Sequence, residues 1–486
     1  MMTLNDALAG MGACQVQTDE AVLGQDFVGI SIDSRTVTPG QIFFAVRGKN
    51  LDGHDYVPQA LAAGAALAVV CEAYEDAVET RLVRVADPLR ALHGLAHSLR
   101  QMHNPLTVAI TGSVGKTTTK NFVGEVFSAL APTVYSRKSF NNEFGVPLSL
   151  CGIEAATRYA CIEIGINTPG EMSALAQMVA PDIGIITNIG MAHIEHFGSK
   201  DGILEEKAKF LDGIRPGGTA VLNADDEKLA SRRAWLQVQG LKTLWFGTSP
   251  EADIRAVSRQ SVGDGQDIEI ATSPDAATIH VHITPGDQGT MYAALACVAA
   301  GVAAGIAPDR IAQILGQVTV ESRMRIRAFA GGQIVDDSYN ASQASMLNGI
   351  EWVSGMTGAA VLVLGDIGEV GTFMTESYRQ VLAAAAAKGV RQVITVGSTG
   401  ANWQEAAAQS GFDPEHLRVT TNWSEALAEL KKSNASGPVN IFVKGSRFSH
   451  LERVALALED QISTCLKVRC TKYIHCSACP EFNGSV

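Results

Sequence analysis

The sequence contains no apolar run that approaches the roughly 18 residues a membrane-spanning helix needs. Its first residues also lack the cationic head and apolar core of a secretory signal. Only 18% of the residues are charged, and acidic residues outnumber basic ones enough to give a formal net charge of −12. This balance argues against a nucleic acid or an anionic membrane as the main partner. Together these absences predict a cytoplasmic globular protein.

The number of cysteines is also modest, at 9 in a chain of 486 residues. Five of these cysteines lie in apolar contexts, which is typical of small buried side chains in a reducing compartment: Cys14, Cys71, Cys151, Cys161 and Cys297. The chain is too long for one ordinary core and should form two to four domains.

Apolar runs such as TVAIT, YACIEIGI, AAVLVLGD and VNIFVKG alternate with longer helical patterns. Several of these runs end in Gly, Asp or Asn, as strands do at the carboxyl edge of a parallel sheet. The pattern predicts doubly wound α/β architecture. We expect domains at residues 1–104, 105–322 and 323–457, followed by a Cys-rich, disordered tail at 458–486.

The stretch VAITGSVGKTTTK, residues 108–120, resembles a phosphate-binding loop that lacks its first glycine, because Ile110 stands there. Gly112, Gly115, Lys116 and Thr117 are in place between an apolar strand and a helical pattern. Backbone N–H groups and a helix N-terminus can then face an anion, while the lysine contacts outer phosphates and the threonine completes a Mg²⁺ shell. A glycine turn with a solvated lysine is the less favoured alternative.

Three further polar residues have weaker signals of their own. Glu163 follows an apolar run, where a buried unpaired carboxylate is costly, so a metal partner fits it. His193 follows another apolar run, but a lone histidine is more often structural than a ligand. Lys207, in ILEEKAKFL, has the pattern of a solvated helix position.

Seven motifs carry a resemblance to a known family. The segments TGSVGKTT, KSFNNEFGVPLSL, EIGINTPGEM, NIGMAHIEHFGS, VDDSYNASQASM, LGDIGEVG and VKGSRF occur in the order found in the Mur ligases. The resemblance covers residues 27–457 and is closest to the branch that adds D-alanyl-D-alanine to UDP-N-acetylmuramoyl-tripeptide. Mur ligases carry a shortened G-x-x-G-K-[ST] loop, so Ile110 is normal for this type.

The resemblance implies three α/β domains: a small N-terminal domain for the uridine nucleotide, a central ATPase-type domain and a C-terminal Rossmann-like domain. It also implies ligation through an acyl phosphate, with ATP, two Mg²⁺ ions, a CO₂-derived carbamate on Lys207 and small-molecule substrates. A monomer is expected. A free lysine, with a pKa of about 10.4, is a cation and cannot bind a metal, whereas its carbamate can.

By motif match, Lys116, Lys207, His193 and Glu163 are the expected catalytic residues. The expected metal ligands are Thr117, Glu163, His193 and carbamylated Lys207, with Lys209 as an alternative to Lys207. The expected ATP-binding residues are Gly112, Ser113, Val114, Gly115, Lys116, Thr117, Thr118, Arg323, Asp337 and Asn340. Arg325 is an alternative to Arg323, and for either arginine a surface salt bridge is an equally good reading.

The resemblance also names two sets of substrate residues. Those expected to bind the uridine nucleotide are Asp33, Ser34, Arg35, Asp52 and His54. Those expected to bind the peptide substrates are Asn141, Asn142, Tyr339, Lys444 and Arg447. The DGH segment could instead be a polar turn, and the paired asparagines could be ordinary loop residues.

Two stretches depart from the family pattern. Where the family has H-N-x-x-N near the adenine, this chain has Asp287, Gln288 and Met291, and methionine hydrogen-bonds an adenine edge poorly. In the tail, Cys470, His475, Cys476 and Cys479 could chelate zinc, although a disordered extension is favoured there.

Three other functions compete with this reading. Another ATP-dependent amide ligase, such as folylpolyglutamate synthase or a sibling Mur ligase, is disfavoured by the DSR and DDSYNA motifs. A regulatory protein that has lost ligation is disfavoured because Lys116, Glu163, His193 and Lys207 are intact. A simple phosphate-loop hydrolase would not need the first and third domains.

Overall fold

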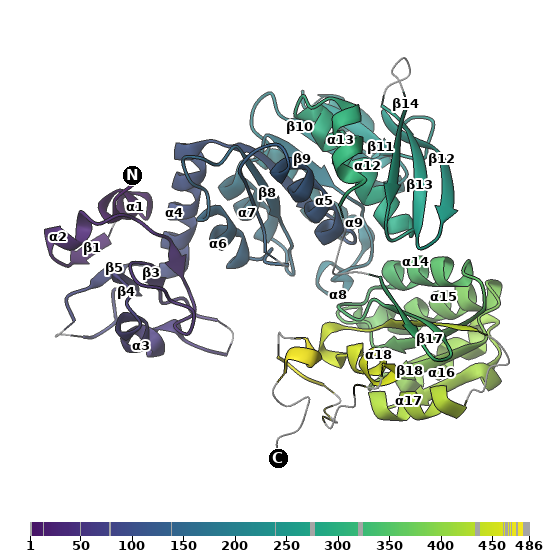
Figure 1. Cartoon of the computed structure of the whole chain (residues 1–486). Helices are drawn as coiled ribbons and strands as arrows, with labels where there is room; N and C mark the ends of the chain where they lie inside the picture. The colour runs from purple at the N-terminus through teal and green to yellow at the C-terminus, as the bar shows by residue number, and fades with distance from the viewer. Residues whose placement is uncertain are drawn as a thin grey trace.

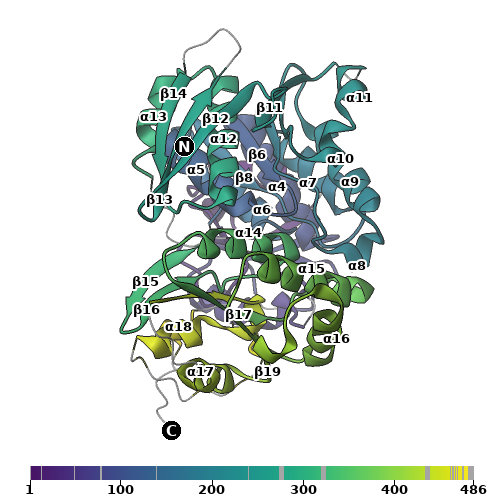
Figure 2. The same ribbon diagram turned by 90° about the vertical axis from the view of Figure 1, so that its right-hand side faces the viewer.

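The computed structural model describes residues 2–12, 14–48, 50–76, 79–137, 139–238, 240–272, 278–318, 324–432, 438–459, 461, 465, 467, 469–472 and 475–479. Within them the chain forms three separate sheets of five, nine and six strands. Each sheet is built from one continuous part of the sequence and is covered by helices (Figures 1 and 2). No helix in the described part of the chain is long and apolar enough to cross a bilayer.

The N-terminal sheet has the strand order β1-β5-β4-β3-β2, with β1 antiparallel to β5 and the other pairs parallel. Its strands are β1 (Cys14–Gln17), β2 (Ile30–Ser31), β3 (Ile42–Phe44), β4 (Leu67–Cys71) and β5 (Leu82–Val85). Its helices are α1 (Leu4–Gly10), α2 (Glu20–Leu23), the 3-10 turn η1 (Gly53–Tyr56) and α3 (Val57–Ala62).

The central sheet has the order β14-β13-β12-β11-β10-β9-β6-β8-β7. The strands β6 (Leu106–Thr111), β7 (Thr133–Tyr135), β8 (Tyr159–Glu163), β9 (Ile183–Ile186), β10 (Thr219–Asn223) and β11 (Lys242–Gly247) are parallel. An extension that the sequence analysis did not predict continues the sheet through β12 (Ile254–Val262), β13 (Gly265–Ala271) and β14 (Thr278–Ile283). Strand β12 is parallel to β11, and the β12–β13 and β13–β14 pairs are antiparallel.

Ten helices in the described part of the chain accompany the central sheet. They are α4 (Pro88–His103), α5 (Lys116–Ser128), α6 (Gly145–Leu150), α7 (Glu171–Val179), α8 (Ile194–Phe197), α9 (Lys200–Ala208), α10 (Glu227–Ala230), α11 (Arg233–Val238), α12 (Gln288–Ala303) and α13 (Pro308–Leu315).

The C-terminal sheet has the order β15-β16-β20-β17-β18-β19, parallel except for the β15–β16 pair. Its strands are β15 (Arg325–Phe329), β16 (Gly332–Asp336), β17 (Ala359–Gly365), β18 (Gln392–Val396), β19 (Leu417–Thr420) and β20 (Val439–Lys444). Its helices are α14 (Gln343–Ser354), α15 (Met374–Ala387), α16 (Gly400–Ser410), α17 (Trp423–Lys432) and α18 (Glu452–Leu458).

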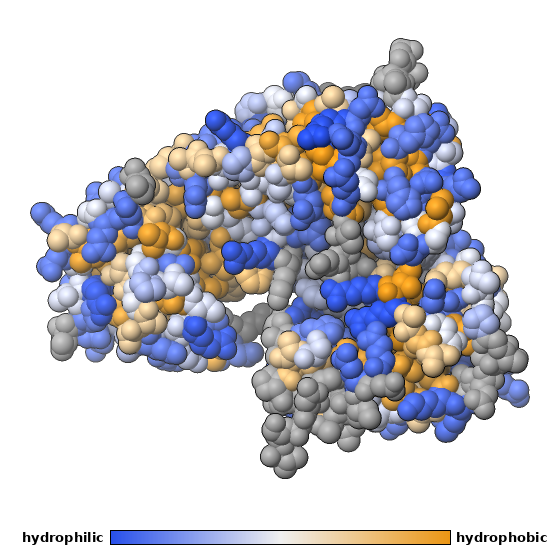
Figure 3. All heavy atoms as spheres, viewed as in Figure 1, coloured by the Kyte–Doolittle hydropathy of each residue, from blue (hydrophilic) through white to orange (hydrophobic). Residues whose placement is uncertain are grey.

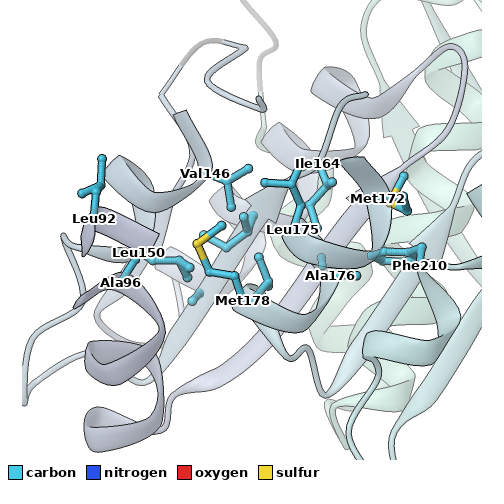
Figure 4. Packing of buried hydrophobic residues seen from close by; sticks show 14 of the residues in the cluster. Leu92, Ala96, Val146, Leu150, Ile164, Met172, Leu175, Ala176, Met178 and Phe210 are labelled. Carbon is cyan, nitrogen blue, oxygen red and sulfur yellow. The ribbon is translucent and has the colours of Figure 1, made fainter. Parts of the chain in front are cut away.

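Helix α4 joins the N-terminal and central sheets through one apolar core. Its buried side chains Leu92, Leu95 and Leu99 belong to the same cluster as β3 and β4 on one side and α6 and α7 on the other. Figure 4 shows Leu92 and Ala96 of α4 beside Leu150 of α6 and Met178 of α7. The three-domain α/β fold expected from the sequence is therefore confirmed, and its parallel strands end where the polar loops begin.

Candidate functional site

Loops from all three sheets line one large cleft of about 3800 Å³. The N-terminal part contributes Asp33, Ser34 and Arg35, and the central part contributes the 113–118 loop. The C-terminal part contributes Asp337, Tyr339, Asn340, Lys444 and Arg447. Figure 3 shows the molecule hollowed between its N-terminal part on the left and its C-terminal part at lower right. Tertiary structure thus brings together motifs that are hundreds of residues apart.

The phosphate-loop motif lies between β6 and α5, as predicted. Gly112 (φ +142°) has no room for a side chain, because a Cβ there would lie 2.0 Å from Thr187 Oγ1. Gly115 (φ +87°) is needed for its left-handed backbone alone, since its surroundings are open. Helix α5 begins at Lys116, so its N-terminal N–H groups face the cleft and can bind an anion.

A second loop, which follows β9, holds the phosphate loop in place. Asn188 Oδ1 accepts from Val114 N at 2.9 Å, and Ser113 Oγ accepts from Gly190 N at 2.8 Å. Lys116 Nζ donates to its own loop carbonyls, at 2.7 Å to Gly112 and 3.2 Å to Ser113. The lysine is therefore folded over the concave side of the loop, where an anion would approach. The sequence analysis missed Asn188, although its place at the end of an apolar strand was a usable signal.

Glu163 lies at the end of β8, only 1% exposed, beside the start of α5. Its Oε1 accepts from Thr117 Oγ1 at 3.2 Å and from Asn141 Nδ2 at 2.7 Å. Its Oε2 is buried and has no hydrogen-bond partner among the described residues. A buried carboxylate oxygen left unpaired beside a hydroxyl fits a hard divalent cation, which supplies the missing positive partner.

His193 lies in the same cleft but contacts the C-terminal domain. Its Nδ1 lies in close contact with a carboxylate oxygen of Glu369, which follows β17 in the LGDIGEVG segment. Both residues have positive φ, +61° and +58°, so each lies on a tight backbone turn. The sequence analysis named His193 and missed Glu369, since no local pattern connects two loops from different domains.

Lys207 is 3% exposed, contrary to the solvated position that its local pattern suggests. Burial, together with the nearby positive charge of Lys116, holds the pKa of Lys207 well below the ordinary lysine value. The alternative, Lys209, is partly exposed and donates to Glu206 Oε2 at 2.6 Å. Lys207 is therefore a buried lysine whose amine loses its proton more readily than a free lysine.

The C-terminal motif residues form one connected group. The buried Lys444 ammonium pairs with Asp337 and donates to the Asn340 carbonyl oxygen at 2.9 Å. Tyr339 Oη donates to Ser139 Oγ of the central domain at 3.2 Å, and the Arg447 guanidinium lies 4.9 Å from the Tyr339 ring centre. Lys444 thus shapes the 337–340 loop, while Tyr339 connects that loop to the central domain.

The N-terminal motifs differ in exposure, with Asp33 and Arg35 open to the cleft and His54 buried beside the partly exposed Asp52. Arg35 makes a two-point contact with Asp33, at 2.9 Å from Nε and 2.7 Å from Nη2, and both residues line the cleft. His54 is buried: its Nδ1 lies 2.5 Å from Asp52 Oδ1, and its Nε2 accepts from Cys71 N at 3.0 Å. The DGH segment therefore fixes the end of β4, as a polar turn would.

The asparagine pair also has structural partners. Asn141 holds Glu163, and Asn142 Oδ1 accepts from Gly145 N at 3.0 Å at the start of α6. Both residues still line the cleft, as does Thr118. Arg323 lies outside the described residues, and the alternative, Arg325, starts β15.

The residues that replace the family's adenine motif contact the C-terminal domain. Asp287 caps the N-terminus of α12, is 3% exposed, and accepts from Asn348 Nδ2 of α14 at 2.7 Å. Burial raises the pKa of Asp287. Gln288 and Asn348 line the cleft, whereas Met291 is buried in the central core. The Asn348 amide is already engaged, because it also accepts from Gly289 N at 3.2 Å, which leaves the Gln288 amide as the polar group of this motif in the cleft. Met291 is a packing residue.

Taken together, the three α/β domains and the phosphate loop in their shared cleft define a multidomain nucleotide-dependent enzyme. Family models match in the same order: Mur ligase family, catalytic domain (residues 26–100), Mur ligase middle domain (110–301) and Mur ligase, glutamate ligase domain (322–447). The UDP-N-acetylmuramoyl-tripeptide–D-alanyl-D-alanine ligase of Escherichia coli K12 is 30% identical over 441 residues, which cover 90% of this chain and 94% of the relative. The chain belongs to the Mur ligase family.

Other relatives agree with this assignment. The Bacillus subtilis enzyme of the same name is 30% identical over 432 residues, covering 88% of this chain and 92% of the relative. A crystal structure of MurF from Acinetobacter baumannii superposes with a TM-score of 0.80 at 28% identity, covering 89% of this chain and 93% of that one. The structure of MurF ligase from Thermotoga maritima in complex with ADP, at 24% identity and a TM-score of 0.77, supports the fold.

Proposed function

We propose that this chain joins D-alanyl-D-alanine to UDP-N-acetylmuramoyl-tripeptide with ATP, giving the UDP-muramoyl-pentapeptide, ADP and phosphate for peptidoglycan synthesis. One observation carries the proposal: the phosphate loop, the buried Glu163 and the motif loops of the outer domains line a single cleft. A ligase needs such a cleft because three substrates must meet in it. The proposal places the reaction in the cytoplasm and treats the chain as a monomer.

The proposed reaction has two chemical steps. A carboxylate oxygen of the tripeptide attacks the γ-phosphorus of ATP, and ADP leaves. The amine of the dipeptide then attacks the acyl carbon, the amide bond forms, and phosphate leaves with the acyl C–O electrons while the amine loses a proton. In both steps the protein positions the reactants and stabilises negative charge. The N-terminus of α5 and Lys116, which both lie in the cleft, would stabilise that charge.

The donor set fits magnesium. Thr117 and Glu163 would hold one ion, and the buried, unpaired Oε2 of Glu163 supports this assignment. His193 and a carbamate on Lys207 would hold the other. When bound, these cations neutralise charge on the triphosphate and on the reacting carboxylate. The low pKa of Lys207 supports the carbamate, because only a neutral amine adds CO₂.

The remaining residues are assigned by motif and by their place in the cleft. Asp33, Ser34 and Arg35 would bind the uridine nucleotide, while Asp52 and His54 would support them by fixing the neighbouring turn. Tyr339 and Arg447 would contact the peptide substrates. Asn141, Asn142 and Lys444 would act by holding Glu163, α6 and the 337–340 loop. Arg323, Asp337 and Asn340 remain predicted ATP contacts.

Phosphate release tests the proposal. ATP and Mg²⁺ are supplied with UDP-muramoyl-tripeptide alone, with D-alanyl-D-alanine alone, and with both. We expect release only with both substrates, together with a product of the mass of the pentapeptide. Release without the dipeptide would indicate a hydrolase, and use of another amine would indicate a different ligase.

A further inference from the structure

The C-terminal segment, whose described residues are 465, 467, 469–472 and 475–479, packs against the C-terminal domain, whereas the sequence analysis expects disorder there. Cys470 N donates to the Phe448 carbonyl oxygen at 2.9 Å. The buried Arg453 guanidinium donates to the carbonyl oxygens of Cys465 and Lys467 at 3.1 and 2.8 Å. The segment therefore covers the 446–450 loop, which carries Arg447 into the cleft.

Three buried side chains with metal-binding atoms meet where this segment packs. His450 Nδ1, a carboxylate oxygen of Glu452 and Cys476 Sγ all lie within 4.8 Å of one another. The three residues are 4%, 6% and 8% exposed, respectively. The zinc set considered from sequence was different, and of its members only Cys476 belongs to this cluster. His475 is exposed and lies beside Ser477 instead, at 2.7 Å from Nδ1 to Oγ.

The hydrogen bonds around His450 fix the state of its ring. Nε2 lies 3.1 Å from the Lys472 carbonyl oxygen, which can only accept, so Nε2 carries a hydrogen. Nδ1 faces two electron-rich atoms, Glu452 Oε1 at 2.8 Å and Cys476 Sγ at 3.6 Å. Glu452 Oε1 also accepts from Cys476 N at 3.2 Å, and either a hydrogen or a metal ion can lie between Nδ1 and these two atoms.

From this geometry we propose that His450 Nδ1, Glu452 and Cys476 Sγ bind one zinc-class divalent cation, which fastens the C-terminal segment onto the 446–450 loop. Mixed N, O and S donors suit zinc. A tetrahedral zinc with ordinary bond lengths separates its nitrogen and sulfur ligands by about 3.6 Å. The observed separation of Sγ from Nδ1 is also 3.6 Å, whereas the 2.8 Å between Nδ1 and Glu452 Oε1 is a hydrogen-bond distance, so this carboxylate oxygen moves away from Nδ1 when the metal binds.

Charge balance supports the same site. Binding displaces the proton on Nδ1 and the thiol proton, so the metal–nitrogen and metal–sulfur bonds replace an N–H and an S–H bond. Neutral histidine, one carboxylate and one thiolate then balance a divalent cation, and the buried site stays neutral overall. The Lys472 carbonyl oxygen keeps the ring oriented, as an outer partner of a metal-bound histidine usually does. Water would complete the fourth position.

The test uses the full-length protein loaded with zinc and then dialysed against metal-free buffer. We expect one equivalent of bound zinc by elemental analysis, and a thiolate-to-metal absorption band after cobalt replaces zinc. Cys476→Ser and Glu452→Gln should each weaken zinc binding at least about 100-fold. Cys479→Ser is the matched control, because Cys479 lies in the same segment but outside the cluster, and it should retain the zinc.

Trypsin cleavage at Lys467, Arg469 and Lys472 gives a readout independent of catalysis. Removing zinc from the wild-type protein with a chelator should speed this cleavage several-fold, and adding zinc back should reverse it. Circular dichroism identifies any variant that fails to fold, and the chelation experiment decides the matter without a variant. No bound zinc in the wild-type protein, or loss of zinc from Cys479→Ser but not from Cys476→Ser, would overturn the proposal.

Discussion

The junction between the N-terminal and central domains differs in kind from the junction between the central and C-terminal domains. The first is an apolar core that runs through α4, with Leu92, Leu95 and Leu99 buried. The second is bridged mainly by polar contacts, Tyr339 with Ser139, Asn348 with Asp287, and His193 with Glu369, beside a smaller apolar contact of the partly buried Phe373. Exposing buried apolar side chains to water costs free energy, whereas a polar group can exchange its protein partner for water at low net cost. The first junction is therefore expected to be rigid and the second to open and close around substrates.

The largest expected effect is on catalysis and comes from substituting Lys116, which lies in the cleft between the central and C-terminal domains. Lys116→Ala should lower kcat by at least about 10³-fold, because it removes the cation that is proposed to stabilise the transferred phosphoryl group. The melting temperature should not change, since the hydrogen bonds from Lys116 Nζ to the Gly112 and Ser113 carbonyl oxygens stay within one loop. Coupled phosphate release and thermal unfolding measure the two quantities, with Lys209→Ala as the exposed-lysine control. Near-normal turnover would refute the phosphate-site assignment.

Leu95→Ala tests the apolar junction. The side chain is fully buried on α4, so truncation should reduce the free energy of unfolding by about 2–5 kcal/mol. The kcat of the folded enzyme should stay the same, because the cleft is not touched. Met102→Ala, on an exposed position of the same helix, should cost less than about 0.5 kcal/mol. Equal destabilisation by the two variants in urea titrations would contradict an apolar junction at α4.

Lys207→Ala removes the proposed carbamate without removing the phosphate loop. We expect kcat to fall by about 10²-fold, because the second cation loses an anionic ligand. Short carboxylates such as formate should restore part of the activity by occupying the freed space. Lys209→Ala should behave like the wild type in the same assay. Absence of rescue at every concentration would count against the carbamate.

The smallest expected effect sharpens the comparison. Tyr339→Phe removes the hydroxyl that donates to Ser139. We expect kcat/KM to fall by a factor equivalent to about 0.5–1.5 kcal/mol of transition-state stabilisation. A double-mutant cycle with Ser139→Ala measures the coupling, and we expect the two losses to be non-additive. Unfolding of the N-terminal and central domains should be unaffected. Additive losses would mean that the two hydroxyl groups do not interact during the reaction.

Strand ends were the part of the site that the sequence predicted best. Glu163 and the phosphate loop follow strongly apolar runs, and the structure has β8 and β6 at those places. The antiparallel strands β12–β14 were missed, although β14 alternates buried and exposed residues with a clear period of two. The burial of Lys207 was also missed, because a charged helix position carries no local sign of what packs against it.

The sequence by itself determined the elements that depend on neighbouring residues: the apolar parallel strands, the glycine loop before α5, and the motif order that identifies the family. Only the tertiary structure decided which distant groups meet. It paired Asn141 with Glu163 and gave both ring nitrogens of His54 a hydrogen-bond partner. It also placed Met291 in the central core and brought Cys476 close to His450 and Glu452. The reason is physical: periodicity and turn chemistry act over a few residues, whereas the partner of a buried polar group is set by how whole sheets and helices pack.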